Sequence, residues 1–446
     1  MKPYLVILAL FAVSGSPLTH AAGPLTPPGS PAPTMKTLQE IWDKLGDIET
    51  RLATLEGTAT ATAEAVTEST ATTTSETESM LSGLASALGV RAGYTWTTSV
   101  VDTSTSAGQY SSLAYDPLTS QPAIAYYNAG SSTLRYAQYN GSSWDKESIT
   151  LTGGGTYISL AFSESGQAGI SCYSPNNDSL IFAARPTPGS TFLAYTVDDD
   201  ASTTFGMFTS VKFGSDGKPA IAYRHQGQLK VARFTAAVTS ATGIWTSSNW
   251  DITTAAEDNQ PGYYNSLAFG PDGYVYIAYC ANTQTELYLA SETDIGIYNN
   301  NYVDGNVGAG IECSMIFLTN GHPAVSYYDE TNHVLKYAEK SGSTWTITTV
   351  DSSSSDVGRY TSIACNSSGE PAISYYDVTN GDLKYAQRAP SGTWKTSTVD
   401  SDGDVGQYTS IAFDTHHRPT ISYYDATNGK LKFAKASRMV FTASAP

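Results

Sequence analysis

The feature that most constrains this chain is a unit of 47 to 56 residues that recurs through most of its length. The stretch ISYYDVTNGDLKYAQ at 373–387 returns as ISYYDATNGKLKFAK 48 residues later, and VSYYDETNHVLKYAE stands 48 residues earlier. Such self-similarity is typical of closed or stacked repeat architectures. Aligned on a shared serine, the chain contains seven units, marked by Ser112, Ser159, Ser210, Ser266, Ser314, Ser362 and Ser410.

Each unit contains four short runs rich in Tyr, Ile, Val and Thr, separated by turns of Gly, Asn and Asp. Examples are YTSIAF (408–413), PTISYYD (419–425), LKFA (431–434) and the Trp-led WKTSTVD (394–400). Alternation with a period of two predicts a strand for each run, and four strands per repeat is typical of a propeller blade. Because 40% of the residues are hydrophobic and 30 are Tyr, a large β-rich core can be filled. The sequence therefore predicts an all-β fold, a seven-bladed β-propeller over residues 94–446.

The sequence also predicts how the ring closes. TWTTSVVD (95–102) is a fourth-strand run that stands before the first complete unit, whereas no such run follows LKFA in the last unit. We therefore expect the N-terminal run to complete the last blade, which removes the exposed strand edges of an open array. The tail RMVFTASAP (438–446) is the alternative occupant of that place.

Several of these motifs resemble those of a known group of proteins. SIAFD, ISYYDATNG, LKFA and the GTW that leads the fourth strand resemble the repeats of uncharacterised secreted bacterial β-propellers, over residues 94 to about 436. This resemblance implies the fold and no particular activity. SGSTW (341–345), PSGTW (390–394) and NGSSW (140–144) also resemble the Asp-box turn of sialidases, but the Asp is absent from all three.

The first 93 residues have the composition of export and spacer segments. Residues 1–21 combine Lys2, an apolar run and small residues up to Ala21, which is typical of a cleaved signal peptide. A Pro-rich linker (22–34) follows, and residues 58–93 form a Thr-, Ala- and Ser-rich spacer. We therefore expect a secreted protein, whether extracellular, periplasmic or held at the cell surface.

Between the linker and the spacer, residues 35–57 carry a heptad seam. Apolar residues recur at alternating steps of three and four, at Leu38, Ile41, Leu45, Ile48, Leu52 and Leu55. Leu at a with Ile or Leu at d predicts a short coiled-coil helix that gathers more than two chains into a homo-oligomer. An ordinary amphipathic helix is the alternative, because so short a seam is marginal alone.

The net charge of −17 narrows the range of partners. Nucleic acid requires clustered Lys and Arg, but the 24 basic residues are outnumbered by 41 acidic ones and form no cluster. The apolar run at 4–13 is too short to span a membrane, and no later stretch is long enough. We therefore expect neither a nucleic-acid partner nor a membrane span, whereas bound calcium suits the acidic balance.

One face of the propeller is predicted to hold the ligand. The loop after the second strand and the loop entering the first strand share this face, and both repeat Tyr and Asp. Tyr rings supply stacking surface for sugars or side chains, and carboxylates orient polar groups. The candidate ligand-binding residues in these loops are Tyr127, Tyr328, Asp329, Tyr376, Asp377, Tyr424 and Asp425. Turn chemistry is the alternative, in which each Asp closes its own loop.

Positions that break the repeat are further candidates. Two residues before the shared Ser, six units carry an aromatic residue, but the fifth unit carries Glu312. Arg224 and His225 replace the usual Tyr and Asp or Asn of the third unit. We include Glu312 and Arg224 among the ligand-binding candidates, and Glu312 would be the acid if the protein is an enzyme. Drift in degenerate blades is the alternative explanation.

A calcium loop is predicted at Asp400, Asp402 and Asp404, because alternate carboxylates let a loop place oxygen ligands around the ion. Val405 departs from the Gly that a tight calcium loop uses at this place. The alternative is solvated surface charge.

A disulfide is predicted between Cys280, which ends a second strand, and Cys313, which begins the next first strand. An unpaired state of both cysteines is the alternative. Cys172 and Cys365 belong to distant units and are expected to be buried thiols.

These features favour a secreted or cell-surface protein that binds a glycan or an extracellular protein through the loop face of its propeller. A sialidase-like glycoside hydrolase or lyase is the second hypothesis, and a structural envelope protein is the third. No Ser-His-Asp arrangement, phosphate-binding loop or histidine metal motif is evident in the sequence.

Overall fold

A computed structural model describes residues 91–151, 154–185, 190–199, 205–238, 245–281 and 285–442, with the side chains of 91–93, 205 and 438–442 left aside. The predicted signal peptide, linker and coiled coil and nearly all of the spacer lie outside these residues.

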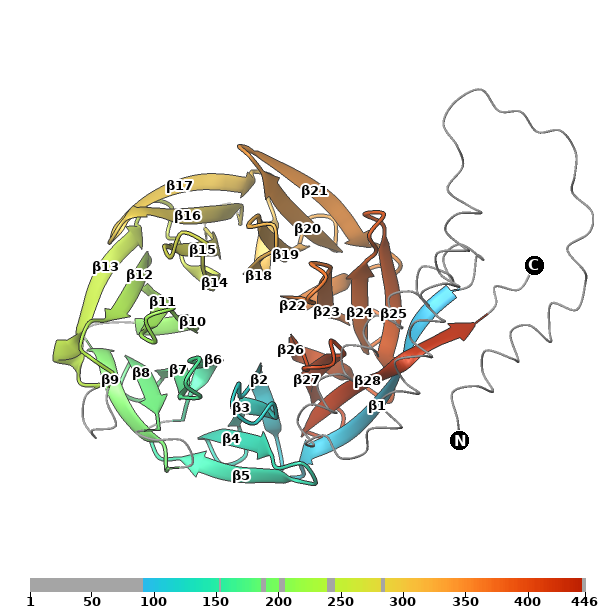
Figure 1. Cartoon of the computed structure of the whole chain (residues 1–446), viewed down its shortest axis with the longest axis horizontal. Helices are drawn as coiled ribbons and strands as arrows, with labels where there is room; N and C mark the ends of the chain where they lie inside the picture. Colours follow the sequence, from blue (N-terminus) through green and yellow to red (C-terminus); the bar gives the residue numbers. More distant parts are fainter. Residues whose placement is uncertain are drawn as a thin grey trace, which may run out of the picture. The chain divides into compact units, whose positions relative to one another are not determined.

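The described residues form seven four-stranded antiparallel sheets arranged around an axis (Figure 1). Each of the first six blades follows the chain from the innermost to the outermost strand. Blade 1 contains β2 (Ala107–Tyr115), β3 (Pro122–Asn128), β4 (Thr133–Tyr139) and β5 (Trp144–Ile149). Blade 2 contains β6 (Thr156–Phe162), β7 (Ala168–Ser174), β8 (Ser179–Ala184) and β9 (Leu193–Asp199). Blade 3 contains β10 (Phe205–Phe213), β11 (Pro219–His225), β12 (Gln228–Phe234) and, after the short 3-10 helix η1 (Ser247–Asn249), β13 (Trp250–Ala256).

The second half of the ring repeats this order. Blade 4 contains β14 (Tyr263–Phe269), β15 (Val275–Cys280), β16 (Leu287–Asp294) and β17 (Ile297–Asp304). Blade 5 contains β18 (Ala309–Phe317), β19 (Pro323–Asp329), β20 (Val334–Ser341) and β21 (Thr344–Asp351). Blade 6 contains β22 (Val357–Cys365), β23 (Pro371–Asp377), β24 (Asp382–Arg388) and β25 (Trp394–Asp400). Blade 7 contains β26 (Val405–Phe413), β27 (Pro419–Asp425) and β28 (Lys430–Thr442). The predicted seven-bladed, all-β fold is confirmed.

The fourth strand of blade 7 is β1 (Arg91–Asp102), which pairs antiparallel with β28 as the sequence predicted (Figure 1). Trp96 of β1 packs against Tyr385 of blade 6 with ring centroids 5.2 Å apart. Trp394 of β25 makes the equivalent contact with Tyr337 of blade 5 at 5.0 Å. The N-terminal run therefore occupies a true fourth-strand position, while residues 438–442 of the alternative tail continue β28 instead.

The shared serines explain how the innermost strands are joined. Each Ser hydroxyl oxygen accepts the backbone N–H of the residue that follows the shared Ser in the next blade, at 2.9–3.2 Å. The last bond of the series runs from Leu113 of blade 1 to Ser410 of blade 7 at 3.0 Å. We call this closed set of seven bonds the serine belt.

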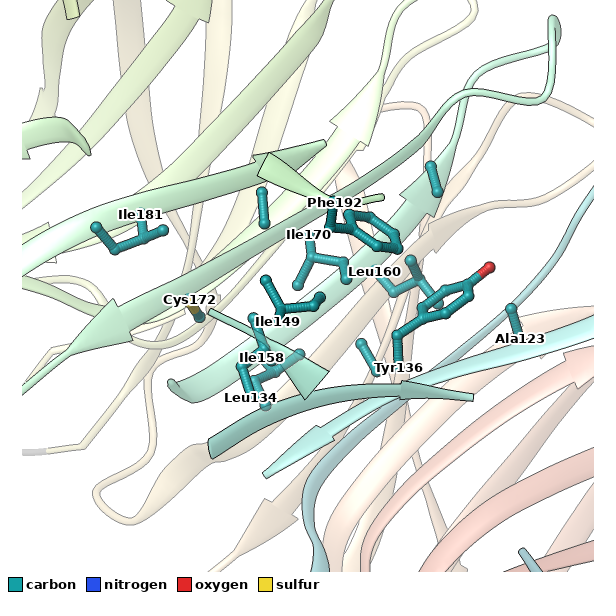
Figure 2. Packing of buried hydrophobic residues seen from close by; sticks show 13 residues of the cluster. Ala123, Leu134, Tyr136, Ile149, Ile158, Leu160, Ile170, Cys172, Ile181 and Phe192 are labelled. Carbon is teal, nitrogen blue, oxygen red and sulfur yellow. The ribbon is translucent and has the colours of Figure 1, made fainter. Parts of the chain in front are cut away.

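Hydrophobic cores fill the spaces between neighbouring blades. Figure 2 shows the core between blades 1 and 2, where Leu134 and Tyr136 of β4 meet Ile158 and Leu160 of β6 and Phe192. Most of these side chains are almost fully buried. Because each core needs both of its blades, the seven sheets stabilise one another around the ring.

The first Tyr of the second strand forms a hydrogen bond across five of the seven blade interfaces. In five interfaces its hydroxyl donates to an Asp that ends, or nearly ends, the outermost strand of the preceding blade, at 2.6–2.7 Å. The five pairs are Tyr126–Asp102, Tyr223–Asp198, Tyr327–Asp304, Tyr375–Asp351 and Tyr423–Asp400. This repeated Tyr is therefore part of the scaffold.

Candidate functional site

The candidate site lies where the innermost strands begin, on the face that carries the loops 330–333, 378–381 and 426–429, here called the Asp-loop face. Each innermost strand has a β-bulge there, seen as a register shift before the shared Ser. The bulged residues have φ between 49° and 54°, which is uncommon for bulky side chains. They are Tyr110, Tyr157, Phe208, Tyr264, Glu312, Tyr360 and Tyr408.

The bulge brings six aromatic side chains from six blades together around the axis. Consecutive rings from Tyr360 through Tyr408, Tyr110, Tyr157 and Phe208 to Tyr264 have centroids 4.4–5.1 Å apart. All six side chains are half-buried. We call this set the axial aromatic ring, and it is interrupted only in blade 5, at Glu312.

Glu312 therefore stands between Tyr264 and Tyr360 in a largely aromatic setting. Its carboxylate accepts the backbone N–H of Tyr360. Burial raises the pKa of Glu312 to about 7 with help from Asp356 and Glu330, although the Tyr360 amide and the charge of Arg359 oppose the rise. Near neutral pH this carboxyl group can both give and take a proton, which is what a general acid or base requires.

Arg359 adds a positive charge to the same place. Its guanidinium lies 4.4 Å from the ring centroid of Tyr328, and its Nε is 4.0 Å from Asp356. The Tyr328 hydroxyl donates to Asp356 at 2.8 Å, so a carboxylate and a tyrosine position the guanidinium, whose charge acts on Glu312. Arg359 was not predicted from the sequence, although the equivalent positions in the other blades carry no charge: Gln109, Thr156, Met207, Tyr263, Ile311 and Gln407.

The predicted Asp residues of the loops have structural partners. Asp329, Asp377 and Asp425 are each at most 3% exposed. Each carboxylate accepts the backbone N–H and the side-chain amide of the Asn three residues later, at 2.8–3.2 Å. Asp329 also pairs with Lys336 at 2.6 Å. These carboxylates close their own loops, which is the turn chemistry considered as the alternative.

The predicted Tyr residues lie around the axial aromatic ring rather than in it. Tyr376 and Tyr424 have centroids 6.1 and 6.4 Å from those of Tyr360 and Tyr408. The Tyr376 hydroxyl donates to Asp404 at 2.7 Å. Tyr127 occupies the equivalent position in blade 1, opposite Gln109, and is half-buried.

Arg224 and His225 occupy two different inter-blade contacts of blade 3, with blade 4 and with blade 2 respectively. The Arg224 guanidinium stacks on Tyr263 at 4.2 Å from its ring centroid, and Tyr263 packs on Phe208 of the axial aromatic ring. His225 lies 3.0 Å from Asp198, the carboxylate that also holds Tyr223. Arg224 thus borders the ring at blades 3 and 4, next to blade 5, which carries Glu312, while His225 belongs to the interface between blades 2 and 3.

Among the described residues no three acidic, His or Cys side chains are grouped to hold a metal, so the calcium loop stays a prediction without support from the structure. Asp400 accepts the Tyr423 hydroxyl and lies 2.5 Å from Lys432. Asp404 instead accepts the Tyr376 hydroxyl, and Asp402 is exposed. The carboxylates of Asp400 and Asp404 therefore have partners in two different blades: Asp400 contacts blade 7, and Asp404 contacts blade 6.

The disulfide prediction is also wrong, because Cys280 and Cys313 are free thiols. The Cys313 thiol donates to the carbonyl of Tyr264 at 2.8 Å. Equivalent donors in other blades are Ser111 and Thr209, at 2.8 and 2.7 Å from the carbonyls of Tyr408 and Tyr157. Cys313 therefore occupies the position that the hydroxyl residues Ser111 and Thr209 occupy in blades 1 and 3, and its thiol makes the same kind of hydrogen bond. Cys172 is buried and free as expected, and Cys365 is free and partly exposed.

A cavity of about 530 Å³ lies away from this site, between blades 1 and 2. Its wall includes Tyr136, Gln138, Glu147 and Arg185. Arg185 pairs with Glu147 and stacks on Tyr136 at 4.8 Å from its ring centroid, so the main charged groups here already satisfy one another. We therefore place the candidate site at the axis.

Comparison with known proteins supports no family assignment: no protein-family model and no curated protein sequence matches this chain. Among solved structures, a protein of unknown function from Dyadobacter fermentans is 12% identical, with a TM-score of 0.47 over 78% of this chain and 99% of that chain. AofleA from Arthrobotrys oligospora is 13% identical, with a TM-score of 0.46 over 69% and 91%. A polysaccharide lyase, an ulvan lyase bound to –[GlcA(1-4)Rha3S]–, is 11% identical, with a TM-score of 0.48 over 79% and 96%.

These likenesses are too remote to say what this chain binds, so its function has to be argued from its own residues. Among the residues that the structure describes, no helix has the length and apolar character that a membrane crossing requires.

Proposed function

We propose that this protein binds carbohydrate at the axial aromatic ring. The observation that carries the proposal is the gathering of six half-buried aromatic side chains, one from each of six blades, at bulged positions with positive φ. Backbone strain of this kind persists where the surrounding structure enforces it and is frequent at binding sites. Half-exposed aromatic faces give sugar rings a surface for stacking.

Polar groups beside the ring would orient the sugar. Five of the six aromatic residues are tyrosines, whose hydroxyls can donate to and accept from sugar hydroxyls. Glu312 and Arg359 supply a carboxyl group and a guanidinium on one side of the ring. A ligand that spans the axis would therefore contact neutral aromatic residues on one side and charged residues on the other. This asymmetry would orient the ligand in the site.

The N-terminal segments fit an exported receptor. A cleaved signal peptide would export the chain, and a coiled coil at 35–57 would hold several propellers on a spacer. Because linked sites raise the effective concentration of each other's ligand, weak single sites would gain an avidity on the order of a hundredfold or more on a repetitive glycan.

A glycan array probed with the full chain tests this function. Tyr408→Ala should abolish or strongly weaken binding, because it removes one face and two ring contacts from the site. Tyr302→Ala is the matched control, since Tyr302 is 54% exposed on the outer strand β17. Binding that survives Tyr408→Ala, or no binding to any glycan, would contradict the proposal and leave a protein ligand or a structural role.

Catalysis is the second candidate function, and the raised pKa of Glu312 favours it. A carboxyl group that titrates near pH 7 can protonate a leaving oxygen in glycoside hydrolysis or abstract a proton in a lyase reaction. Glu312→Gln keeps the size of the side chain and an oxygen to accept the Tyr360 N–H. Release of reducing sugar by the wild type that Glu312→Gln abolishes, with binding retained, would establish an enzyme rather than a receptor.

A further inference from the structure

Below the axial aromatic ring, the axis contains a cavity of about 410 Å³ that the candidate site does not use. Its wall is formed by the innermost strands at and beyond the serine belt. Ser112, Ser266, Ser314, Ser362 and Ser410 line it, together with Lys212.

The serine belt supplies hydrogen-bond donors to this cavity. Each belt hydroxyl uses its oxygen to accept a backbone N–H from the next blade, and the same hydroxyl still carries a hydrogen. No acceptor for that hydrogen is found among the described residues. A ring of hydroxyl donors with a common orientation toward one axis suits a group that accepts several hydrogen bonds at once.

Lys212 breaks the repeat at this level. The equivalent residue two positions after the shared Ser is Ala114, Ala161, Ala268, Ala364 or Ala412 in five blades and Ile316 in another. Lys212 therefore places an ammonium group against a wall that is otherwise apolar or hydroxylic. The Lys212 side chain is exposed to the space of the axis, and within the described part of the chain no carboxylate forms an ion pair with it.

We propose that the cavity below the axial aromatic ring binds a small oxyanion, of the sulfate, phosphate or carboxylate type, between the ammonium of Lys212 and the hydroxyls of the serine belt. An anion would supply the counter-charge that Lys212 lacks and the acceptors that the hydroxyls lack. The site is independent of the carbohydrate site, because it uses neither the aromatic residues nor Glu312.

Thermal unfolding of the full chain in sodium sulfate, phosphate or acetate, against sodium chloride at equal ionic strength, tests the proposal. A ligand of the folded state raises the unfolding temperature in a saturable manner, whereas a general salt effect does not saturate. A response to sulfate and phosphate alone assigns a tetrahedral ion, and a response to acetate extends the site to carboxylates.

Two variants and a control identify the site. Lys212→Ala installs the residue that five other blades carry, so it should fold, and it should weaken the saturable response by about tenfold or more because the charge-assisted bond is lost. Lys212→Gln keeps the length of the side chain without its charge and should lose the response equally. Lys395→Ala removes an exposed charge from β25 and should leave the response unchanged.

The outcomes separate clearly. A saturable response in the wild type and in Lys395→Ala, lost in both Lys212 variants, supports the site. No saturable response in the wild type, a response retained by Lys212→Gln, or an equal loss in Lys395→Ala overturns it.

Discussion

The hydroxyl of Tyr375 in blade 6 donates a 2.6 Å hydrogen bond to the carboxylate of Asp351 in blade 5. Lys384 lies 2.5 Å from the same carboxylate, and all three side chains are at most 9% exposed. A buried charge is tolerated when hydrogen bonds and a counter-charge surround it, and removing one partner is costly. Each such triad joins two blades at the edge of the Asp-loop face, so it supports both the ring and the site above it.

Tyr375→Phe is expected to destabilise the propeller by about 1–3 kcal/mol, because it leaves Asp351 with one donor fewer in a buried place. Tyr139→Phe, which removes a half-buried hydroxyl on the opposite face, should change the free energy of unfolding by less than about 0.5 kcal/mol. Urea denaturation measures both. Equal effects of the two changes would show that the hydrogen bond does not matter for stability.

The same carboxylates predict acid lability. Burial disfavours the charged form of Asp102, but the bonds from Ser104, Tyr126 and Arg135 outweigh it and lower the pKa from 3.8 to about 2. The folded state therefore holds this proton less tightly than the unfolded chain, so the stabilisation is complete above pH 3.8 and is lost as the pH falls toward 2. The pKa values of Asp198, Asp329, Asp351, Asp400 and Asp414 are lowered too.

Denaturant titrations from about pH 6 to about pH 2 check this expectation. The free energy of unfolding should fall steeply below about pH 4, and Asp102→Asn should flatten part of that fall. A curve that stays level through this range would mean that these carboxylates are no better stabilised in the fold than in the open chain.

The serine belt predicts the effect of single hydroxyl deletions at ring closure. Ser410→Ala leaves the backbone N–H of Leu113 without its acceptor where blade 7 meets blade 1, at a cost of about 1–3 kcal/mol. Ser362→Ala, which frees the N–H of Ile411 within the array, should cost about the same, because the belt is cyclic and has no weak joint. A much smaller loss for Ser410→Ala, measured by urea unfolding, would indicate that the two ends of the chain are not firmly joined.

Much of this fold could be predicted because repetition is itself the signal. The period, the four runs per unit and the displaced run at 95–102 determine seven blades and the closing strand.

The site was predicted only in part, because it depends on a backbone geometry that the amino-acid pattern of the repeat does not specify. The six aromatic positions and Glu312 were noticed as a pattern and its exception, but the bulge with positive φ that turns them to the axis was not. Asp377 and Asp400 look alike in the sequence as loop carboxylates, yet one closes its own loop and the other reaches a neighbouring blade. Arg359 and Lys212 were not predicted, although each is a charged residue at a position where the other six units carry an uncharged one.

Close packing of the innermost strand of blade 6 against the third strand of blade 5 makes Gly358 intolerant of a side chain. A Cβ at Gly358 would lie 2.7 Å from the Cα of Leu335, and the residue has a φ of 117°. Gly358→Ala should therefore cost about 3 kcal/mol or more, and side-chain movement cannot relieve the clash, because the contact is with backbone. Gly342 has a φ of 61° and open space around it, so Gly342→Ala should lower the free energy of unfolding by only about 1 kcal/mol. Similar losses for the two variants would argue against tight packing at the bulge.

Glu312 should change the pH dependence of stability in the opposite direction to the aspartates, because its pKa is raised. The folded state keeps the proton up to about pH 7, whereas a glutamate with the ordinary value of 4.5 has already released it in the unfolded chain. The stability that the protonated group contributes is therefore present below pH 4.5 and is lost as the pH rises through about 7. Glu312→Gln should match the wild type near pH 4 and be more stable by about 1–3 kcal/mol near pH 9.

Urea unfolding of Glu312→Gln at these two pH values, with the exposed Glu164→Gln as control, isolates the effect. The control should show no pH-dependent difference from the wild type. If Glu312→Gln also shows none, the carboxyl group titrates normally, and its position in the gap of the axial aromatic ring would then favour a charged contact for a ligand over acid–base catalysis.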